Sequence, residues 1–354
     1  MTNMEKEKLN ELKILKAELK VFKQKLQEKI ESSEQIFITT HKNPDIDAIS
    51  SAIGLSLIAK KLKKKSYIIM DDKIDTINSG VLTILDTISD DFQTITTKMY
   101  KEIKTDNDLL VVTDTNKRNL ICCEDYLDDF KSIVVIDHHN QDSRSIQTLN
   151  KFIKPKMTSA CEIVSCLIEE FKINYSQDIA NYFLAGIILD SNNLRTETST
   201  QNTFEIVSKL IGKGANINFA NELLDENFET EIKVNDIIKE TNFYSYTIAI
   251  CCSNNTTIIP PNFLAKAANK LKGFNNDLSC VIGRIDENTI KISARSNGKI
   301  NADEVMKIFD GGGDIYRAAA SIEDTDIENV KKRLIKVLKP TFYINERDLK
   351  NEES

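Results

Sequence analysis

Three short apolar segments of the chain, IFITT, LLVVT and SIVVI, each run directly into residues that can bind a metal ion. The acids and imidazoles that follow these segments are His41, Asp45 and Asp47, then Asp114, and then Asp137, His138 and His139. They include all three histidines of the 354-residue chain. If the segments are neighbouring strands of an open parallel sheet, their carboxyl ends share one edge, where ligands bind. The spacing therefore predicts one cluster of carboxylates and imidazoles.

The charge of this cluster indicates what it would bind. Asp45, Asp47 and Asp114, together with Asp190 at the end of the apolar segment LAGIILD, carry four negative charges. Burying like charges together is costly unless cations neutralise them, and two divalent ions supply four positive charges. Oxygen-rich ligation with two imidazoles and no thiolate suits Mn²⁺, with Mg²⁺, Co²⁺ or Zn²⁺ as alternatives. Any one of these aspartates alone is more often an N-cap or turn residue, so the prediction depends on their joint occurrence.

The elements that must position these residues alternate in character along the chain. From Gln35 onward, short apolar strands are separated by amphipathic helical segments, which predicts a parallel sheet covered on both faces. Further helical patterns lie at 159–171, 179–189 and 203–240, the last interrupted at GKGAN. After Thr241 a second unit begins, with strands in YTIAICC, LSCVIGRI and TIKISARS and helices at 261–272, 301–309 and 325–338.

The N-terminal segment has an apolar seam of its own. Its apolar residues recur every three or four positions, at Leu9, Leu12, Leu15, Leu19, Phe22, Leu26 and Ile30. This spacing predicts a helix with a coiled-coil-like seam. The helix is either an arm that forms a homodimer or an element that packs back on its own domain, and the sequence leaves both open.

The composition limits the classes of protein that the chain can belong to. The net charge of −7 argues against broad binding to duplex nucleic acid, which needs a basic face. No apolar stretch approaches the roughly 20 residues that cross a bilayer, and the charged N-terminus lacks the apolar centre of a signal peptide. The seven cysteines form no CxxC pair, which predicts reduced, mostly buried thiols. We therefore expect a cytoplasmic protein without membrane insertion.

Several motifs in the chain resemble those of a known family. HKNPDIDA, VVTDT, VVIDHH, ILDSNN, ISARSNGKIN and GGGD, in this order from about Ser33 to Leu338, resemble the DHH phosphoesterase superfamily with its DHH-associated C-terminal domain. HKNPDIDA, LRTETST and ISARS look like the catalytic portion of the membrane-anchored cyclic-di-AMP phosphodiesterases. Those relatives carry transmembrane helices, a PAS-like domain and a degenerate GGDEF domain ahead of this portion, and we expect none of these within the 354 residues. The chain is expected to be a stand-alone version or an excised fragment.

The resemblance implies a division of the chain and a fold. The fold is α/β, with a parallel sheet flanked by helices, a smaller C-terminal α/β domain and a preceding helix. The expected divisions are an N-terminal helix at 1–32, a DHH catalytic domain at 33–222, a helical linker at 223–240, a DHH-associated substrate-binding domain at 241–339 and a tail at 340–354.

The resemblance also implies a role for each residue of the predicted cluster. One metal ion would be held by His41, Asp45 and Asp114. The other would be held by Asp47, by Asp114 as the bridge, and by His138 and Asp190. His139 would help to hold the phosphate or assist proton transfer, and Asp137 would orient an imidazole.

Contacts to the substrate are implied mainly in the second unit. They come from Arg295, Ser296, Gly311, Gly312, Gly313 and Asp314, with Arg195 as a further contact. The GGG loop is expected to open onto a helix and to offer free N–H donors. Relatives read GGGH where this chain reads GGGD. Asp314 is an acceptable N-cap but a poor partner for phosphate, which predicts weakened or altered substrate preference, by roughly 1–3 kcal/mol in affinity.

The function implied is a phosphodiesterase that hydrolyses cyclic di-AMP to linear pApA through a two-metal-activated hydroxide. The partners expected are a cyclic dinucleotide or a short oligonucleotide. A nanoRNase or pAp phosphatase of the same superfamily is an alternative, and a nucleotide sensor with weakened catalysis is another. The sequence does not separate cyclic di-AMP from cyclic di-GMP, because base selection depends on the shape of the pocket.

Overall fold

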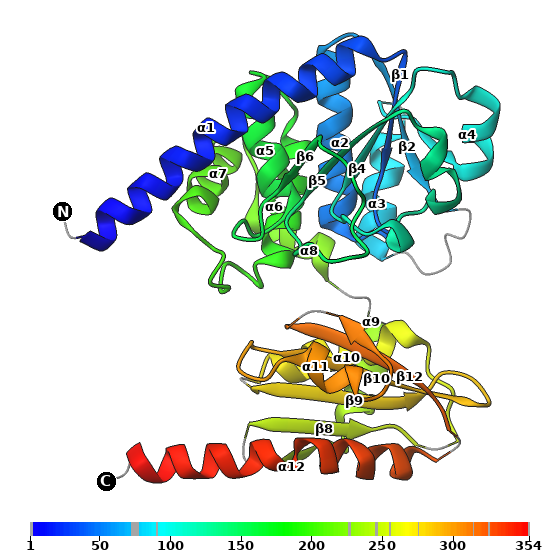
Figure 1. The fold of residues 1–354 in the computed structure, drawn as a ribbon, viewed down its shortest axis with the longest axis vertical. Coiled ribbons are helices and arrows are strands. Elements are labelled where there is room, and N and C mark those ends of the chain that lie inside the picture. Colours follow the sequence, from blue (N-terminus) through cyan, green and yellow to red (C-terminus); the bar gives the residue numbers. More distant parts are fainter. Residues whose placement is uncertain are drawn as a thin grey trace. The chain divides into compact units, whose positions relative to one another are not determined.

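The computed structural model describes residues 3–71, 78–89, 91–225, 228–244, 247–254, 256–274, 276–313, 315–324 and 326–352. They form two compact units, a first unit spanning Met1–Asp225 and a second unit spanning Glu226–Ser354 (Figure 1). Among the described helices, none combines the length and the apolar character that crossing a bilayer requires. All seven cysteines are free thiols, and five of them are buried, as the sequence predicted.

The first unit is built around a six-stranded, wholly parallel sheet. Its strands are β1 (Gln35–Thr39), β2 (Lys65–Met70), β3 (Thr94–Thr96), β4 (Leu109–Thr113), β5 (Ser132–Asp137) and β6 (Lys151–Ile153). Its helices are α1 (Asn3–Ser32), α2 (Ile46–Lys61), α3 (Ser79–Ile88), α4 (Thr97–Ile103), α5 (Ala160–Glu170), α6 (Gln177–Asp190), α7 (Gln201–Gly212) and α8 (Ile217–Leu224). The predicted strands and the parallel sheet are confirmed, whereas the short strands β3 and β6 were not predicted.

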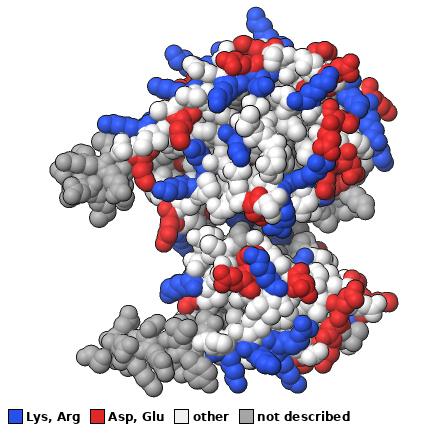
Figure 2. Space-filling view, viewed as in Figure 1, with Lys and Arg blue, Asp and Glu red and all other residues white. Residues whose placement is uncertain are grey.

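Both faces of this sheet are buried, which is why its strands are apolar without alternation. Ile36 and Ile38 of β1 point to the face that is covered by α1, α2, α5 and α6. Phe37 between them points to the opposite face, which packs on Tyr100 of α4 and on Phe130. Acidic and basic side chains are interspersed over the face of the first unit drawn in Figure 2.

Helix α1 packs on its own domain. Leu19, Phe22, Leu26 and Ile30 are all buried in the core of the first unit. The long helix runs along this unit in Figure 1. The seam that the sequence predicted is therefore buried from Leu19 onward within one chain, and homodimerisation stays a prediction.

Replacing Leu26 with Ala is expected to destabilise the first unit by about 2–5 kcal/mol, because a fully buried leucine leaves a cavity when it is truncated. The free energy of unfolding in urea measures this change. Val21, which is 54% exposed on the same helix, provides the control, and Val21→Ala should change stability by less than about 0.5 kcal/mol. If Leu26→Ala dissociated a dimer without destabilising the chain, the helix would be an arm after all.

The second unit contains a mixed six-stranded sheet in the order β11-β12-β10-β9-β8-β7. Its strands are β7 (Asn242–Tyr244), β8 (Ile248–Cys252), β9 (Leu278–Arg284), β10 (Thr289–Ser296), β11 (Gly312–Gly313) and β12 (Arg317–Glu323). Its helices are α9 (Phe228–Ile238), α10 (Pro261–Lys272), α11 (Ala302–Lys307) and α12 (Ile327–Glu352). Helices α11 and α12 pack on one face of this sheet, and α9 and α10 pack on the other.

The GGG loop differs from the prediction. It does not open onto a helix, because Gly312 and Gly313 form β11, which pairs with β12 as an antiparallel strand. The N–H groups of Gly311 and Gly313 already donate to Met306 O, at 3.0 Å, and to Asp303 Oδ1, at 2.8 Å. The glycines are needed for close packing instead, since a Cβ on Gly313 would lie 2.1 Å from Arg317 O. Free N–H donors at Gly311 and Gly313, as predicted for a ligand, are therefore not available.

Candidate metal centre

The order of the strands in the first unit places a switch point between β1 and β4. The sheet has the order β3-β2-β1-β4-β5-β6, so the direction of winding reverses between β1 and β4. Such a switch point leaves an open crevice beyond the carboxyl ends of the two strands. The segments that follow β1, β4 and β5 carry the predicted acids and imidazoles, and Asp190 joins them from the last turn of α6.

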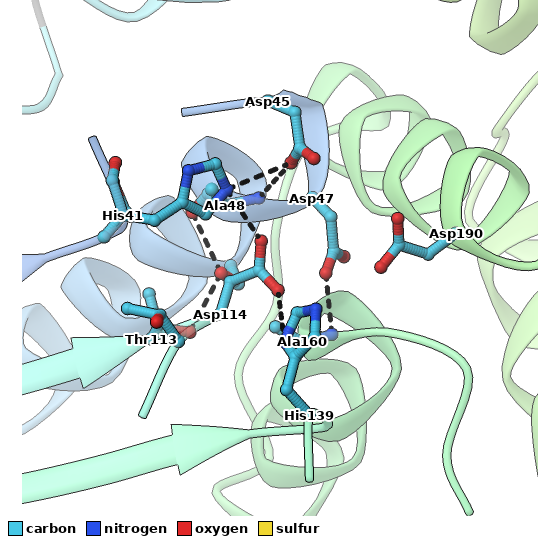
Figure 3. A network of polar contacts seen from close by, with 12 residues as sticks. His41, Asp45, Asp47, Ala48, Thr113, Asp114, His139, Ala160 and Asp190 are labelled. Atoms are coloured by element: carbon cyan, nitrogen blue, oxygen red, sulfur yellow. Dashed lines mark hydrogen bonds and ion pairs between the residues drawn. The ribbon is translucent and has the colours of Figure 1, made fainter. Parts of the chain in front are cut away.

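One group of ligand atoms comes from His41, Asp45 and Asp114. His41 Nε2 lies 3.4 Å from Asp114 Oδ2 and 4.0 Å from Asp45 Oδ1. Asp45 is also the N-cap of α2, because its Oδ1 accepts a hydrogen bond from Ala48 N at 3.0 Å. The three residues offer ligand atoms within 4.8 Å of one another. In Figure 3 the His41 ring faces both carboxylates, with a dashed line to each.

A second group comes from Asp47, Asp114, His138 and Asp190, whose ligand atoms also lie within 4.8 Å of one another. His138 Nε2 lies 2.9 Å from Asp190 Oδ2 and 3.3 Å from Asp114 Oδ1. Asp47 is fully buried. The structure thus brings together both ligand sets that the resemblance implied, and they share Asp114.

The shared residue has an unusual backbone conformation. Asp114 follows β4 with a φ of 59°, in the left-handed region that few residues other than Gly, Asn and Asp adopt. Its N–H group donates to Ile136 O at 3.1 Å, which joins the end of β4 to β5. This turn aims the carboxylate between the two histidines that flank it, His41 and His138. Strained backbone of this kind is often found where a site needs one particular side-chain direction.

Asp137 organises the two adjacent histidines. Its Oδ1 accepts hydrogen bonds from His138 N, at 2.8 Å, and His139 N, at 3.2 Å, and lies 2.9 Å from His139 Nδ1. Its Oδ2 accepts from Asn116 Nδ2 at 2.6 Å. The arrangement fixes the His139 ring and leaves its other nitrogen, Nε2, for a ligand.

The carboxyl groups of the cluster strongly influence one another's pKa. Burial, with the charges of Asp114 and Asp190, raises the pKa of Asp47 well above its usual range. Burial and the charge of Asp114 raise the pKa of Asp45 to about 6. Burial also opposes ionisation of Asp114, but the close approach of the His138 and His41 imidazoles outweighs burial and lowers the pKa of this carboxyl. Without further cations, the cluster therefore holds protons at acids that would be ionised in water.

Two atoms at the centre of the cluster are buried without a well-aligned hydrogen bond. Asp114 Oδ1 and His138 Nε2 lie 3.3 Å apart, and His138 Nε2 lies 2.9 Å from Asp190 Oδ2, but neither atom makes a hydrogen bond of acceptable geometry. Buried polar atoms are rarely left in this state, and those that are unpaired often face a ligand or ion. Carboxylate oxygens and imidazole nitrogens are the donors that Mn²⁺, Mg²⁺ and Zn²⁺ accept. The residues present therefore fit a centre for divalent cations.

Asp47 is held by a contact that the sequence analysis missed. Ala160 N and Cys161 N, the first N–H groups of α5, donate to its Oδ2 at 2.7 Å and its Oδ1 at 2.8 Å. Helix α6 approaches the same place closely, since a Cβ on Gly186 would lie 2.9 Å from Asp47 Oδ1. The pattern Ser-x-x-Glu at 159–162 is a capping-box signal that marks the start of α5, but the sequence alone does not say that this start faces Asp47.

The residues predicted to contact substrate in the second unit have different environments. A pocket of about 310 Å³ in this unit is lined by Pro261, Ala265, Lys291, Ser293, Arg295, Gly312, Arg317, Ala318 and Ala319. Arg295 and Gly312 were predicted as substrate contacts. Lys291 and Arg317 were not predicted, because their position in the pocket depends on how the strands pair. Arg295 lies directly opposite Arg317 in the register of β10 and β12.

The remaining predicted contacts do not line this pocket. Ser296 is buried, and its hydroxyl donates to Asp277 O at 2.9 Å. Gly311 and Gly313 are outside the lining as well. Arg195 lies exposed in the first unit, just after the left-handed turn at 192–194. Asp314 lies outside the described residues.

Two family models match this chain, one in each unit. The DHH family's N-terminal domain matches residues 35–187, and the DHHA1 domain matches residues 245–340. The cyclic-di-AMP phosphodiesterase GdpP of Bacillus subtilis is 32% identical over 327 residues, which cover 89% of this chain and 49% of GdpP. The bifunctional oligoribonuclease and PAP phosphatase NrnA of Thermus thermophilus is 21% identical, with 86% of this chain and 89% of NrnA covered. This chain thus spans about half the length of GdpP.

A solved structure shares the fold. An exopolyphosphatase-related protein from Bacteroides fragilis superposes with a TM-score of 0.71 at 20% identity, over 91% of this chain and 98% of that one. The fold and the cluster define a two-domain α/β protein with a candidate metal centre at the switch point of a parallel sheet. The two matching domains extend over most of the chain. The chain belongs to the DHH family and carries a DHHA1 domain after the DHH domain.

Proposed function

We propose that this chain is a metal-dependent phosphodiesterase that hydrolyses cyclic di-AMP to linear pApA. The observation that carries the proposal is the pair of ligand groups that share Asp114, at the edge of the sheet where the winding of the strands reverses. The cyclic-di-AMP phosphodiesterase activity of GdpP, and the match over most of this chain, support the choice of substrate.

The residues of the first unit would hold two divalent cations, with Mn²⁺ as the proposed ion and Mg²⁺, Co²⁺ or Zn²⁺ as alternatives. When bound in such a site, divalent cations lower the pKa of water and neutralise the charge of a phosphate. Asp114 would tie the two ions together, since it belongs to both ligand groups. His139, with Nδ1 held by Asp137, would present Nε2 to the phosphate or pass a proton to the leaving oxygen.

The pocket of the second unit would bind a phosphate of the substrate. Arg295 is held in place, since its Nε donates to Asn269 Oδ1 at 2.5 Å and its guanidinium to Ala294 O at 2.9 Å. Lys291 lies on the same face of β10, where burial and the nearby charge of Arg295 lower its pKa. Like charges on one face of a sheet repel one another, and an anion in the pocket would relieve this repulsion.

Product analysis tests the proposal. The full chain with Mn²⁺ is given cyclic di-AMP, cyclic di-GMP, pApA and pAp in turn, and the products are separated by chromatography. We expect cyclic di-AMP to be converted to pApA faster than the other three are consumed. Asp114→Ala serves as the blank, because it removes the shared ligand.

One observation favours a second candidate. The match with NrnA extends over 89% of that enzyme, whereas the match with GdpP extends over 49% of GdpP. In that case the chain would be an oligoribonuclease or pAp phosphatase. Consumption of pAp or of linear dinucleotides, with cyclic di-AMP left intact, would establish this alternative and exclude the first proposal.

A further inference from the structure

Glu162 is a fully buried carboxylate in the first turn of α5. Its Oε2 accepts hydrogen bonds from Thr158 N, at 2.8 Å, and from Thr158 Oγ1, at 2.7 Å. Asn202 Nδ2 donates to its Oε1 at 2.6 Å, and Thr203 Oγ1 lies 3.2 Å from its Oε2. A buried carboxylate is costly to maintain, and a set of contacts this complete fixes the segments that supply the donors.

The first of these segments leads to Asp47. Thr158 precedes Ser159, the N-cap of α5, whose hydroxyl accepts from Glu162 N at 3.0 Å. The next two N–H groups, on Ala160 and Cys161, are the ones that donate to the Asp47 carboxylate. Glu162 therefore anchors the short segment that sets the direction of both donors.

The second segment leads to Asp190. Asn202 and Thr203 lie in the first turn of α7, and Thr203 Oγ1 accepts from Thr200 N at 3.1 Å. The loop at 191–200 joins this turn to Asp190, the last residue of α6. Glu162 thus fixes the far end of the loop that begins at Asp190.

Asp47 and Asp190, the two acids that Glu162 supports through these segments, belong to the same ligand group, which consists of Asp47, Asp114, His138 and Asp190. The other group depends on different supports, because His41 follows β1 and Asp45 is held at the start of α2 by Ala48 N. We propose that Glu162 is a positioning residue for the Asp47–Asp190 half of the centre and not for the His41–Asp45 half. The proposal rests on the proposed function in so far as the cluster must bind cations.

The test is a titration of the metal-free full chain with Mn²⁺. Calorimetry and electron paramagnetic resonance measure the affinity of each Mn²⁺ site. In Glu162→Gln, one of the two carboxylate acceptors becomes an amide donor that faces the Thr158 or Asn202 donors. We expect affinity at one Mn²⁺ site to fall by about 10- to 100-fold, as is typical when a residue that supports a metal ligand is changed. Affinity at the other site should change by less than about threefold. Thr203→Val removes one of the four hydrogen bonds to the Glu162 carboxylate, together with the bond from Thr200 N within the turn, and should give a smaller loss at the same site.

Asp108 provides a matched control in the same unit. It is a buried acid whose carboxylate accepts from Thr105 N, at 2.6 Å, and Thr105 Oγ1, at 2.7 Å, but it precedes β4 at the opposite end of the sheet from the cluster. Asp108→Asn should lower thermal stability and leave both Mn²⁺ affinities unchanged. An equal loss at both sites in Glu162→Gln, or no loss in either Glu162→Gln or Thr203→Val, would overturn the proposal. If the unsubstituted chain bound no divalent cation, the proposed function itself would fail, and that result is distinct from the other two.

Discussion

Asp114→Asn should lower the rate of phosphodiester hydrolysis by roughly 10³-fold or more, since changes to residues that merely support a ligand already cost 10–100-fold. The reason is that Asp114 belongs to both ligand groups, so one substitution damages both halves of the centre. Asn keeps the size of the side chain and tolerates the left-handed backbone at this position, where φ is 59°. The loss would therefore come from ligation, and not from misfolding.

Single-turnover hydrolysis and Mn²⁺ binding would be measured on the same preparation of Asp114→Asn. Asp142 offers a control acid on the same edge of the sheet, where it pairs with Lys117 and Arg144. Asp142→Asn should retain hydrolysis and metal binding, because Asp142 is outside both ligand groups. An Asp114→Asn variant that kept two bound ions, or a tenth of the original rate, would show that this residue is not the bridge.

The ligands could be predicted from the sequence because local patterns mark both the strands and their ends. LLVVT gives a fully buried strand, and in the structure all five residues of β4 are buried, with Asp114 immediately after them. The predicted cluster required that the three strands end at one edge of a parallel sheet, and β1, β4 and β5 are indeed neighbours there. Residue type and strand order therefore suffice to bring His41, Asp114 and His138 together.

The supports of these ligands depend on contacts that no local pattern encodes. The N–H groups that hold Asp47 are main-chain atoms of Ala160 and Cys161, more than a hundred residues further along the chain. Main-chain donors are identical in every residue type, so the sequence carries no sign of which helix start faces which acid. For the same reason, the place of Arg317 in the pocket was not predicted, because it depends on its register opposite Arg295.

The GGG loop was predicted wrongly for a related reason. Three glycines followed by a helical pattern further on are compatible with a loop at a helix start, and also with two short strands. The two short strands form because Gly313 packs directly against the backbone of Arg317, where even a Cβ would not be accommodated. That fit depends on β12, whose sequence RAAASIE is rich in alanine and has no strong strand pattern.

The affinity for Mn²⁺ is expected to rise steeply with pH, because the cation must displace protons from the histidines of the centre. Burial opposes protonation of His41, but the hydrogen bond with Asp114 and the charges of Asp45 and Asp114 outweigh it and raise the pKa to about 10. Interactions with Asp114 and Asp190 likewise outweigh burial and raise the pKa of His138. Near neutral pH, the metal-free chain therefore carries protons on both imidazoles, and only the neutral form binds a metal.

A rise in pH has opposite effects on the stability of the metal-free fold and on the stabilisation that bound Mn²⁺ adds. Because the pKa of His41 is raised from 6.5 to about 10, its ion pairs stabilise the metal-free fold fully below pH 6.5, and this contribution is lost as the pH rises through 10. The stabilisation that Mn²⁺ adds should instead grow over this range. Each proton displaced makes the apparent affinity about tenfold higher per pH unit, so two protons would give about a hundredfold.

Calorimetric titrations between pH 6 and 8, in buffers that differ in their heat of ionisation, would count the protons released on binding. We expect at least two protons per chain, one from each imidazole and a further contribution from Asp47, whose pKa is raised, with an increase in the Mn²⁺-induced shift of the melting temperature across the same range. Mg²⁺ should release the same number, because the protons leave the protein whichever cation enters. An affinity that is independent of pH, with no proton release for either ion, would mean that His41 and His138 are not ligands.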